Sequence, residues 1–80
     1  MQDKKDWDSY LYFLKVAETG NLGSSARALG VNHSTVFRRI NSLEERLQVR
    51  LFERSRKGYT LTEAGEEIIS SVEMIEDQIF

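Results

Sequence analysis

Residues 26–43 carry small and apolar side chains at the spacing of two consecutive short helices. These positions are Ala26, Leu29, Val31, Val36, Ile40 and Leu43. The pattern stops at Gly30 and resumes after the turn formed by residues 30–32. This layout is typical of a helix-turn-helix, in which the second helix is presented outward from the domain.

The segment before this motif predicts one further helix, from Asp6 to Thr19. Its apolar positions recur at intervals of three and four and form a stripe that we interpret as core: Trp7, Tyr10, Phe13, Leu14 and Ala17. Gly20 can adopt the positive φ that ends a helix, and Asn21 can cap the helix that follows. The chain therefore begins with a scaffold helix that leads into the motif.

The two helices of the motif are predicted at residues 23–29 and 33–47. The small side chain of Ala26 lets these helices approach closely, and Asn32 is the predicted N-cap of the second. The inward stripe of the second helix consists of Val36, Ile40, Leu43 and Leu47.

Residues 51–61 change to a period of two, which indicates a two-stranded hairpin. Phe52 and Leu61 are expected to face inward, and Ser55–Gly58 forms a polar turn in which glycine supplies a positive φ. A hairpin that follows a helix-turn-helix is a wing, and Arg56 and Lys57 stand at its tip. The fold class is therefore mainly α: a winged helix-turn-helix with a three-helix core, a two-stranded wing and a long final helix.

The final helix is predicted to begin after Thr62 as its cap and to continue to Phe80. Its apolar positions are spaced by four, three and four, as in a coiled-coil seam, and are assigned to dimerisation: Ile68, Val72, Ile75 and Ile79. We expect residues 1–61 to form the winged domain and residues 62–80 a linker helix. Because this helix has no stop signal, we expect the chain to be a fragment of a longer protein.

The composition excludes several classes of function. The 80 residues contain no cysteine and one histidine, and they show no metal-ligand spacing or convergent carboxylate pair. We therefore expect no enzyme activity, no cofactor and no metal. The chain has neither a signal peptide pattern nor an apolar stretch that could span a bilayer, so we predict a cytoplasmic protein without a membrane partner.

The charge is distributed unevenly along the chain, although the formal net charge is only −2. Residues 27–57 hold eight lysines and arginines against three glutamates, a surplus of +5. Residues 58–80 hold six acids and no base, or −6. A local basic block can contact phosphate whatever the global charge, but a solvated charged face explains the same count equally well.

The outer face of residues 33–47 separates these two interpretations. Its N-terminal half is hydroxylic and cationic, with Ser34, Thr35 and Arg38, whereas Glu44 and Glu45 occur only in the C-terminal half. That asymmetry suits a helix whose N-terminal end enters the major groove of DNA. Arg38 is the leading candidate for base contact, with Ser34 and Thr35 beside it. Four further cations are candidates for phosphate contact: Arg39, Arg54, Arg56 and Lys57.

Several motifs together resemble the N-terminal domain of LysR-type transcriptional regulators. They are Val-Ala-Glu-Thr-Gly at 16–20, Ala26…Leu29-Gly30-Val31, Val36…Arg38-Arg39-Ile40, Leu43-Glu44…Leu47, Leu51-Phe52-Glu53-Arg54 and Leu61-Thr62-Glu63-Ala64-Gly65. The resemblance covers about residues 7–75. It implies sequence-specific binding of double-stranded DNA at promoters, as dimers or tetramers on interrupted inverted repeats. It also implies a linker helix that dimerises and a C-terminal domain, absent here, that binds a small-molecule inducer.

The recognition helix departs from the common family pattern Ser-Gln-Pro-Ala-Val-Ser. This chain has Asn-His-Ser-Thr-Val-Phe at residues 32–37, so that Phe37 replaces a serine that usually faces DNA. Phe37 could contact a thymine methyl group, pack on a sugar edge or cover the neighbouring helix. His33 can exchange a hydrogen bond with a base or phosphate, and Gln48 replaces the usual glycine after the helix.

A protein-interaction or dimerisation module without DNA binding is the alternative function. The acidic net charge and an exposed Phe37 favour it slightly. The cations on the outer helix face and at the wing tip argue against it, because charged residues are depleted at the core of protein interfaces.

Overall fold

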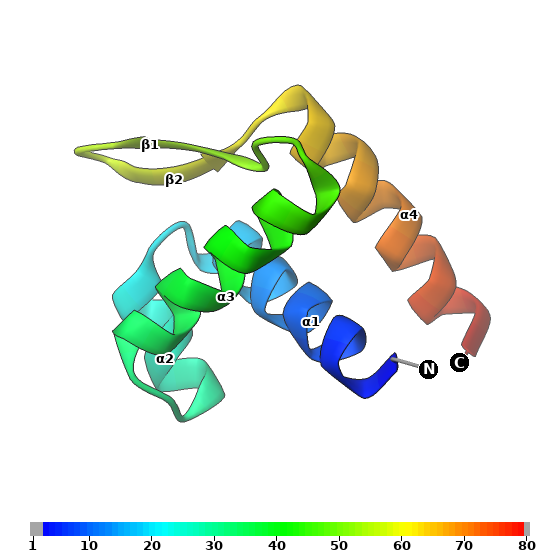
Figure 1. Ribbon diagram of the computed structural model, residues 1–80, viewed down its shortest axis with the longest axis horizontal. Helices are drawn as coiled ribbons and strands as arrows, with labels where there is room; N and C mark the ends of the chain where they lie inside the picture. The colour runs from blue at the N-terminus through cyan, green and yellow to red at the C-terminus, as the bar shows by residue number, and fades with distance from the viewer. Residues whose placement is uncertain (1–2, 80) are drawn as a thin grey trace.

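The computed structural model describes residues 3–79, and it describes the side chains of residues 8–71. The elements are α1 (Asp3–Thr19), α2 (Leu22–Leu29), α3 (His33–Leu47), β1 (Phe52–Ser55), β2 (Gly58–Leu61) and α4 (Glu63–Ile79). Figure 1 shows the hairpin projecting from one side of the α1–α3 body, with α4 leading away from the base of the hairpin. The predicted winged helix-turn-helix fold, with its long final helix, is confirmed.

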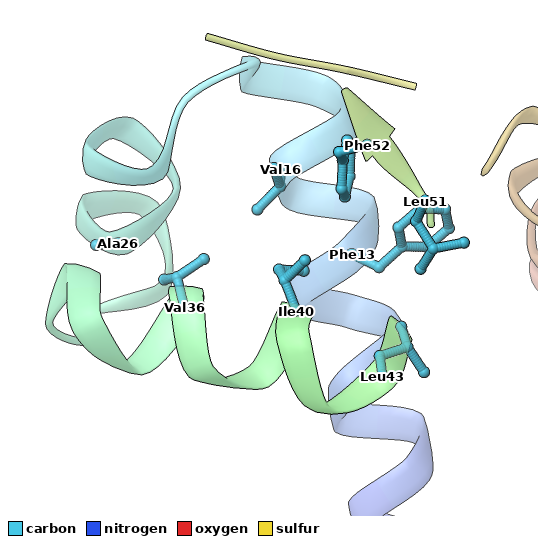
Figure 2. Close-up of a cluster of buried hydrophobic side chains, with 8 residues drawn as sticks. All are labelled: Phe13, Val16, Ala26, Val36, Ile40, Leu43, Leu51 and Phe52. Carbon is cyan, nitrogen blue, oxygen red and sulfur yellow. The ribbon is translucent and has the colours of Figure 1, made fainter. Parts of the chain in front are cut away.

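The core lies where α1, α2 and α3 meet the start of β1. Its side chains are Phe13, Val16, Ala26, Val36, Ile40, Leu43, Leu51 and Phe52, each at most 5% exposed. Figure 2 shows the α3 members pointing from one face of that helix toward α1. The predicted inward stripe of α3 is therefore correct, since Leu47 also packs against this cluster.

The helix boundaries agree closely with the sequence pattern except at the start of α1. The predicted bounds of α3 are those observed, and α2 begins one residue early, at Leu22. The prediction that α1 begins at Asp6 is wrong, because the helix begins at Asp3. No helix breaker separates Asp3 from Asp6, and an acidic residue at a helix N-terminus interacts favourably with the macrodipole. The side chain of Trp7 lies outside the described residues.

The caps of α2 and α3 differ in chemistry. Asn21 accepts a 2.8 Å hydrogen bond from the Ser24 amide through its side-chain oxygen, as predicted. Asn32 occupies the N-cap position of α3, but the predicted side-chain cap is absent. Its backbone carbonyl instead accepts from the amides of Thr35 and Val36 at 3.1 and 3.4 Å. The tight first turn of α3 thus satisfies the Thr35 amide without the side chain.

The hairpin is antiparallel, with Phe52 opposite Leu61 and Ser55 opposite Gly58. The Phe52 ring meets the rings of Phe13 and Tyr59 edge-on, at centroid distances of 5.5 and 5.6 Å. The Tyr59 amide also donates a 2.9 Å hydrogen bond to the carbonyl of Gly20, in the turn between α1 and α2. The wing is therefore attached to the helical body by packing of Phe52 at its base and by a backbone hydrogen bond from Tyr59 closer to its tip.

Thr62 joins α4 to the segment between α3 and β1. Its hydroxyl donates to the Arg50 carbonyl at 2.6 Å and accepts from the Gly65 amide at 3.0 Å, which confirms the predicted N-cap. Gly65 is buried so closely against this segment that an added Cβ would lie 2.4 Å from the Leu51 carbonyl oxygen. Further along α4, Ile68 and Ile69 pack against the core.

The extent of α4 agrees with the prediction over the described residues of this helix. The helix runs to Ile79, and Phe80, its predicted last residue, lies outside the described residues. Among the described helices, none combines the length and apolar character that crossing a membrane requires.

Gln48 ends α3 in the left-handed region, with φ of 61° and ψ of 33°. Its amide donates to the Glu44 carbonyl, so the conformation closes the helix as a glycine would. A side chain with a Cβ is disfavoured in this region by about 1–2 kcal/mol. The sequence departure at this position therefore places strain at the end of the recognition helix.

We predict that Gln48→Gly raises the free energy of unfolding by about 1 kcal/mol, because glycine removes this strain and returns only part of the gain through its more flexible unfolded chain. The melting temperature, followed by far-UV circular dichroism, should rise by roughly 4–8 °C. The matched control is Gly30→Gln, at φ of 71° with open space around the added Cβ, which should lower stability by a similar amount. Equal stability of Gln48→Gly and the parent chain would contradict the inference that the backbone of Gln48 is strained.

Candidate nucleic-acid interface

The turn between α2 and α3 presents the recognition helix on the surface. Gly30 adopts a left-handed conformation at the end of α2, and its amide donates to the Ala26 and Arg27 carbonyls. In the first half of α2, the fully buried Ser25 side chain hydrogen-bonds the Thr19 hydroxyl at 2.7 Å and donates to the Asn21 carbonyl at 2.9 Å. The orientation of α2 relative to α1 is fixed by these contacts, and α3 is held by the apolar core below.

The N-terminal half of α3 exposes most of the residues predicted to contact DNA. His33, Ser34, Phe37 and Arg38 are exposed, and Thr35 is half-buried. Arg39 is also half-buried, with its guanidinium 5.1 Å from the centre of the Tyr12 ring in α1. The exposed set forms one continuous surface, because residues three and four apart on a helix are neighbours.

A small cationic pocket lies beside this surface, between α1 and α3. It is lined by Ser9, Arg38, Arg39, Ser42 and Arg46. Arg46 lies seven residues after Arg39, so helical spacing places both on one flank of α3. That spacing is the sequence signal that could have indicated Arg46 as a neighbour of Arg39 in this pocket.

The tip of the wing carries the two cations that the sequence predicts there. Arg56 and Lys57 form the turn between β1 and β2, and both are exposed. The Lys57 amide donates to the Ser55 hydroxyl at 3.2 Å, which fixes the turn locally. The wing tip therefore offers two exposed positive charges on a short, ordered hairpin.

Arg54 differs from the other predicted phosphate contacts, because its guanidinium has several partners inside the domain. It donates to Asn41 Oδ1 at 2.7 Å and to Glu44 Oε1 at 3.1 Å. It also lies 5.5 Å from the centre of the Phe37 ring and 5.2 Å from that of Tyr59. Arg54 thus connects the wing to α3, a role that the sequence did not indicate.

Glu44 is the acceptor at the centre of this connection. Its Oε2 accepts from the Leu51 amide at 2.8 Å and the Phe52 amide at 3.3 Å, while Oε1 accepts from Arg54. The Glu44 side chain is only 11% exposed. One carboxylate therefore attaches the end of α3 to Leu51 and to Phe52, the first residue of β1. The sequence pattern predicts only that this acid lies away from phosphate.

Comparison with known proteins places this geometry in a family. The model of the bacterial regulatory helix-turn-helix protein, lysR family, matches residues 7–66. The chain belongs to this family. The match includes the whole helix-turn-helix and the wing, so the LysR-type resemblance inferred from the motifs is confirmed.

Individual relatives agree with the family assignment. The chain is 50% identical to the HTH-type transcriptional regulator TfdS of Cupriavidus pinatubonensis over 54 residues. Those 54 residues are 68% of this chain and 18% of TfdS. Over 56 residues it is 52% identical to the regulator IlvY of Escherichia coli, or 70% of this chain and 19% of IlvY. The chain thus spans about a fifth of the length of these curated relatives.

A solved structure gives the most direct comparison with this LysR-family domain. The DNA-binding domain of CbnR, crystallised as a complex with DNA, superposes with a TM-score of 0.78 at 37% identity. The superposition covers 85% of this chain and 78% of that domain. The arrangement of recognition helix and wing is therefore that of a LysR-family domain solved with DNA.

The predicted dimerisation seam of the LysR-family linker helix is described only at its start. Ile68 is half-buried against the core of its own domain. The side chains of Val72, Ile75 and Ile79 lie outside the described residues, although the backbone of α4 is helical through Ile79. The assignment of these four residues to dimerisation stays a prediction.

We predict that Glu44→Gln lowers the free energy of unfolding by about 2 kcal/mol. The amide removes the charge that pairs with Arg54, and its NH2 group then faces either the Leu51 and Phe52 amides or the Arg54 guanidinium, which are donors themselves. Thermal and urea unfolding would measure the loss. Glu45→Gln is the matched control: the neighbouring carboxylate is exposed, so its effect should stay within about 0.5 kcal/mol. Equal effects of the two substitutions would contradict the structural role of Glu44.

Proposed function

We propose that this chain binds double-stranded DNA sequence-specifically, as the DNA-binding part of a bacterial transcriptional regulator. The observation that carries the proposal is the exposed, hydroxylic and cationic N-terminal half of α3, flanked by a wing whose tip exposes Arg56 and Lys57. In this arrangement α3 enters the major groove, and the wing lies on the backbone or the minor groove. The similarity to a CbnR domain crystallised with DNA supports the same docking.

The proposed contacts fall into two groups by chemistry. Arg38 contacts a base edge, because its fork of donors matches guanine O6 and N7, and His33, Ser34 and Thr35 lie beside it. Arg39, Arg56 and Lys57 contact phosphates, which position the domain without carrying sequence information. Arg54, also predicted as a phosphate contact, is the member of this set with the most partners inside the domain.

The proposed assembly is a homodimer formed through α4, with residues 1–61 as the DNA-binding unit and residues 62–80 as the linker. Two copies related by twofold symmetry would bind an interrupted inverted repeat at a promoter. A tetramer and a response to a small-molecule effector require a C-terminal domain outside these 80 residues. The place of action is the cytoplasm, at the nucleoid, where promoter DNA lies.

Selection of duplexes from a randomised DNA pool by the 80-residue chain tests this function. An enriched interrupted inverted repeat would support sequence recognition by a dimer, and its spacing would give the distance between the two recognition helices. An enriched single half-site would support recognition by a monomer and would contradict dimerisation of this chain alone. No enrichment and no salt-sensitive duplex binding would favour the protein-interaction module instead.

We predict that Arg38→Ala lowers affinity for the selected site by about 1–3 kcal/mol and relaxes the preference at one base pair, because the bidentate base contact is lost. Affinities for the selected site and for its single-base variants would be compared by fluorescence anisotropy. Unchanged affinity and preference would contradict the base-contacting role of Arg38.

We predict that Lys57→Ala weakens binding to all sequences by a similar factor, because a phosphate contact carries no base information. The slope of log K against log salt should flatten by about one unit. The matched control is Lys15→Ala, since Lys15 lies on α1 in a 2.8 Å pair with Glu18, and its salt slope should equal that of the parent. A loss confined to one sequence would contradict the role of Lys57.

A further inference from the structure

Phe37 is an apolar ring on the surface proposed to face DNA. It is 43% exposed, and among the described residues only Val49 is another large hydrophobic side chain with comparable exposure. It lies on α3 within three or four residues of Ser34 and Asn41, so that it shares their face of the helix. The Phe37 ring is therefore not part of the buried core, and its exposed surface is available to a ligand.

The Phe37 ring has a defined neighbour on the wing. The Arg54 guanidinium lies 5.5 Å from its centroid, within the range of a cation–π interaction. Arg54 itself is held by Asn41, Glu44 and the Tyr59 ring. The support of Phe37 is thus anchored at both α3 and β2, which limits the conformations that the ring can adopt before DNA binds.

These contacts argue against one of the three roles that the sequence leaves open for Phe37, and the two remaining roles differ in whether they discriminate between bases. Covering the neighbouring helix does not account for a ring that is 43% exposed and that packs with a wing residue. Contact with a sugar edge would give affinity without discrimination. In the major groove, the apolar group that distinguishes bases is the 5-methyl group of a pyrimidine.

We propose, on the basis of the DNA-binding function above, that Phe37 is a specificity-determining residue for the 5-methyl group of a pyrimidine. Arg54 is the corresponding positioning residue, because it holds the ring from the wing side. The ligand chemistry is shared by thymine and 5-methylcytosine, which present the same methyl group in the major groove. The domain should therefore prefer a methylated pyrimidine at one position of each half-site.

Replacement of single thymines by deoxyuridine tests the proposal, since uracil keeps the base pair and lacks only the methyl group. In the selected site, one thymine of each half-site should be sensitive, with affinity falling about fourfold when its methyl contact is lost. At that position, a C·G pair should also bind better when the cytosine carries a 5-methyl group. Uracil tolerated at every thymine would overturn the proposal, whereas a selection that enriches no site would overturn the proposed function itself.

Variants of Phe37 connect this sensitivity to the ring. Phe37→Ala should bind the thymine and uracil duplexes with equal affinity, while Phe37→Leu should keep part of the preference because it remains apolar. Val49→Ala is the matched control: it also shortens an exposed apolar side chain, but it lies beyond α3, so the thymine-to-uracil ratio should be unchanged. A full ratio in Phe37→Ala would overturn the assignment.

Arg54→Gln separates positioning from structural and phosphate-binding roles. If Arg54 positions Phe37, the thymine-to-uracil ratio should fall toward one. If Arg54 acts only on stability or on phosphate, affinity should fall for both duplexes and the ratio should stay that of the parent, which would overturn the positioning role. Arg54→Lys retains the charge but not the planar stacking group, so it should also lose most of the ratio. Circular dichroism at the assay temperature ensures that only folded variants are compared.

Discussion

The geometry of the proposed interface depends on the hydrogen bonds that the Glu44 carboxylate accepts. This carboxylate accepts two backbone amides at the start of β1 and one hydrogen bond from Arg54, although it is only 11% exposed. A negative charge in such a place is stable only when its lone pairs are occupied. The wing must therefore leave α3 in a direction that keeps these donors on one carboxylate, so the contacts of Glu44 set the position of the hairpin relative to the recognition helix.

The sequence predicts the elements well where local chemistry decides the outcome. The bounds of α3 are those expected, because its apolar stripe and the turn at Gly30 indicate the same helix. Thr62 caps α4, as expected of a hydroxyl residue that precedes an acidic first turn. Asn32 shows the limit of such reasoning. Its residue type favours a side-chain cap, but the backbone of the first turn satisfies the Thr35 amide instead.

The candidate site is harder to predict because its decisive contacts join residues far apart in the chain. Helical spacing predicts Ser34 and Arg38 on the outer face of α3 and Phe37 on its flank, and the structure exposes all three. The same spacing could not indicate that Arg54 would reach Asn41 and Glu44, which lie thirteen and ten residues earlier. The sequence therefore predicts a phosphate contact for Arg54 and no structural role for Glu44, whereas both are occupied by contacts within the domain.

The joining of wing and helix has a consequence for how specificity can change in such a domain. A serine at position 37, as is common in the family pattern, would offer Arg54 no ring, and the guanidinium would then rest on Tyr59, Asn41 and Glu44 alone. The ring of Phe37 gives the wing a contact to the proposed base-facing surface, since Arg54 lies against both Phe37 and Tyr59. If Phe37 contacts a base as proposed, a substitution at the wing alters base preference without any wing residue contacting a base. The effect would propagate through one planar cation, because Arg54 orders the aromatic side chain against which it packs.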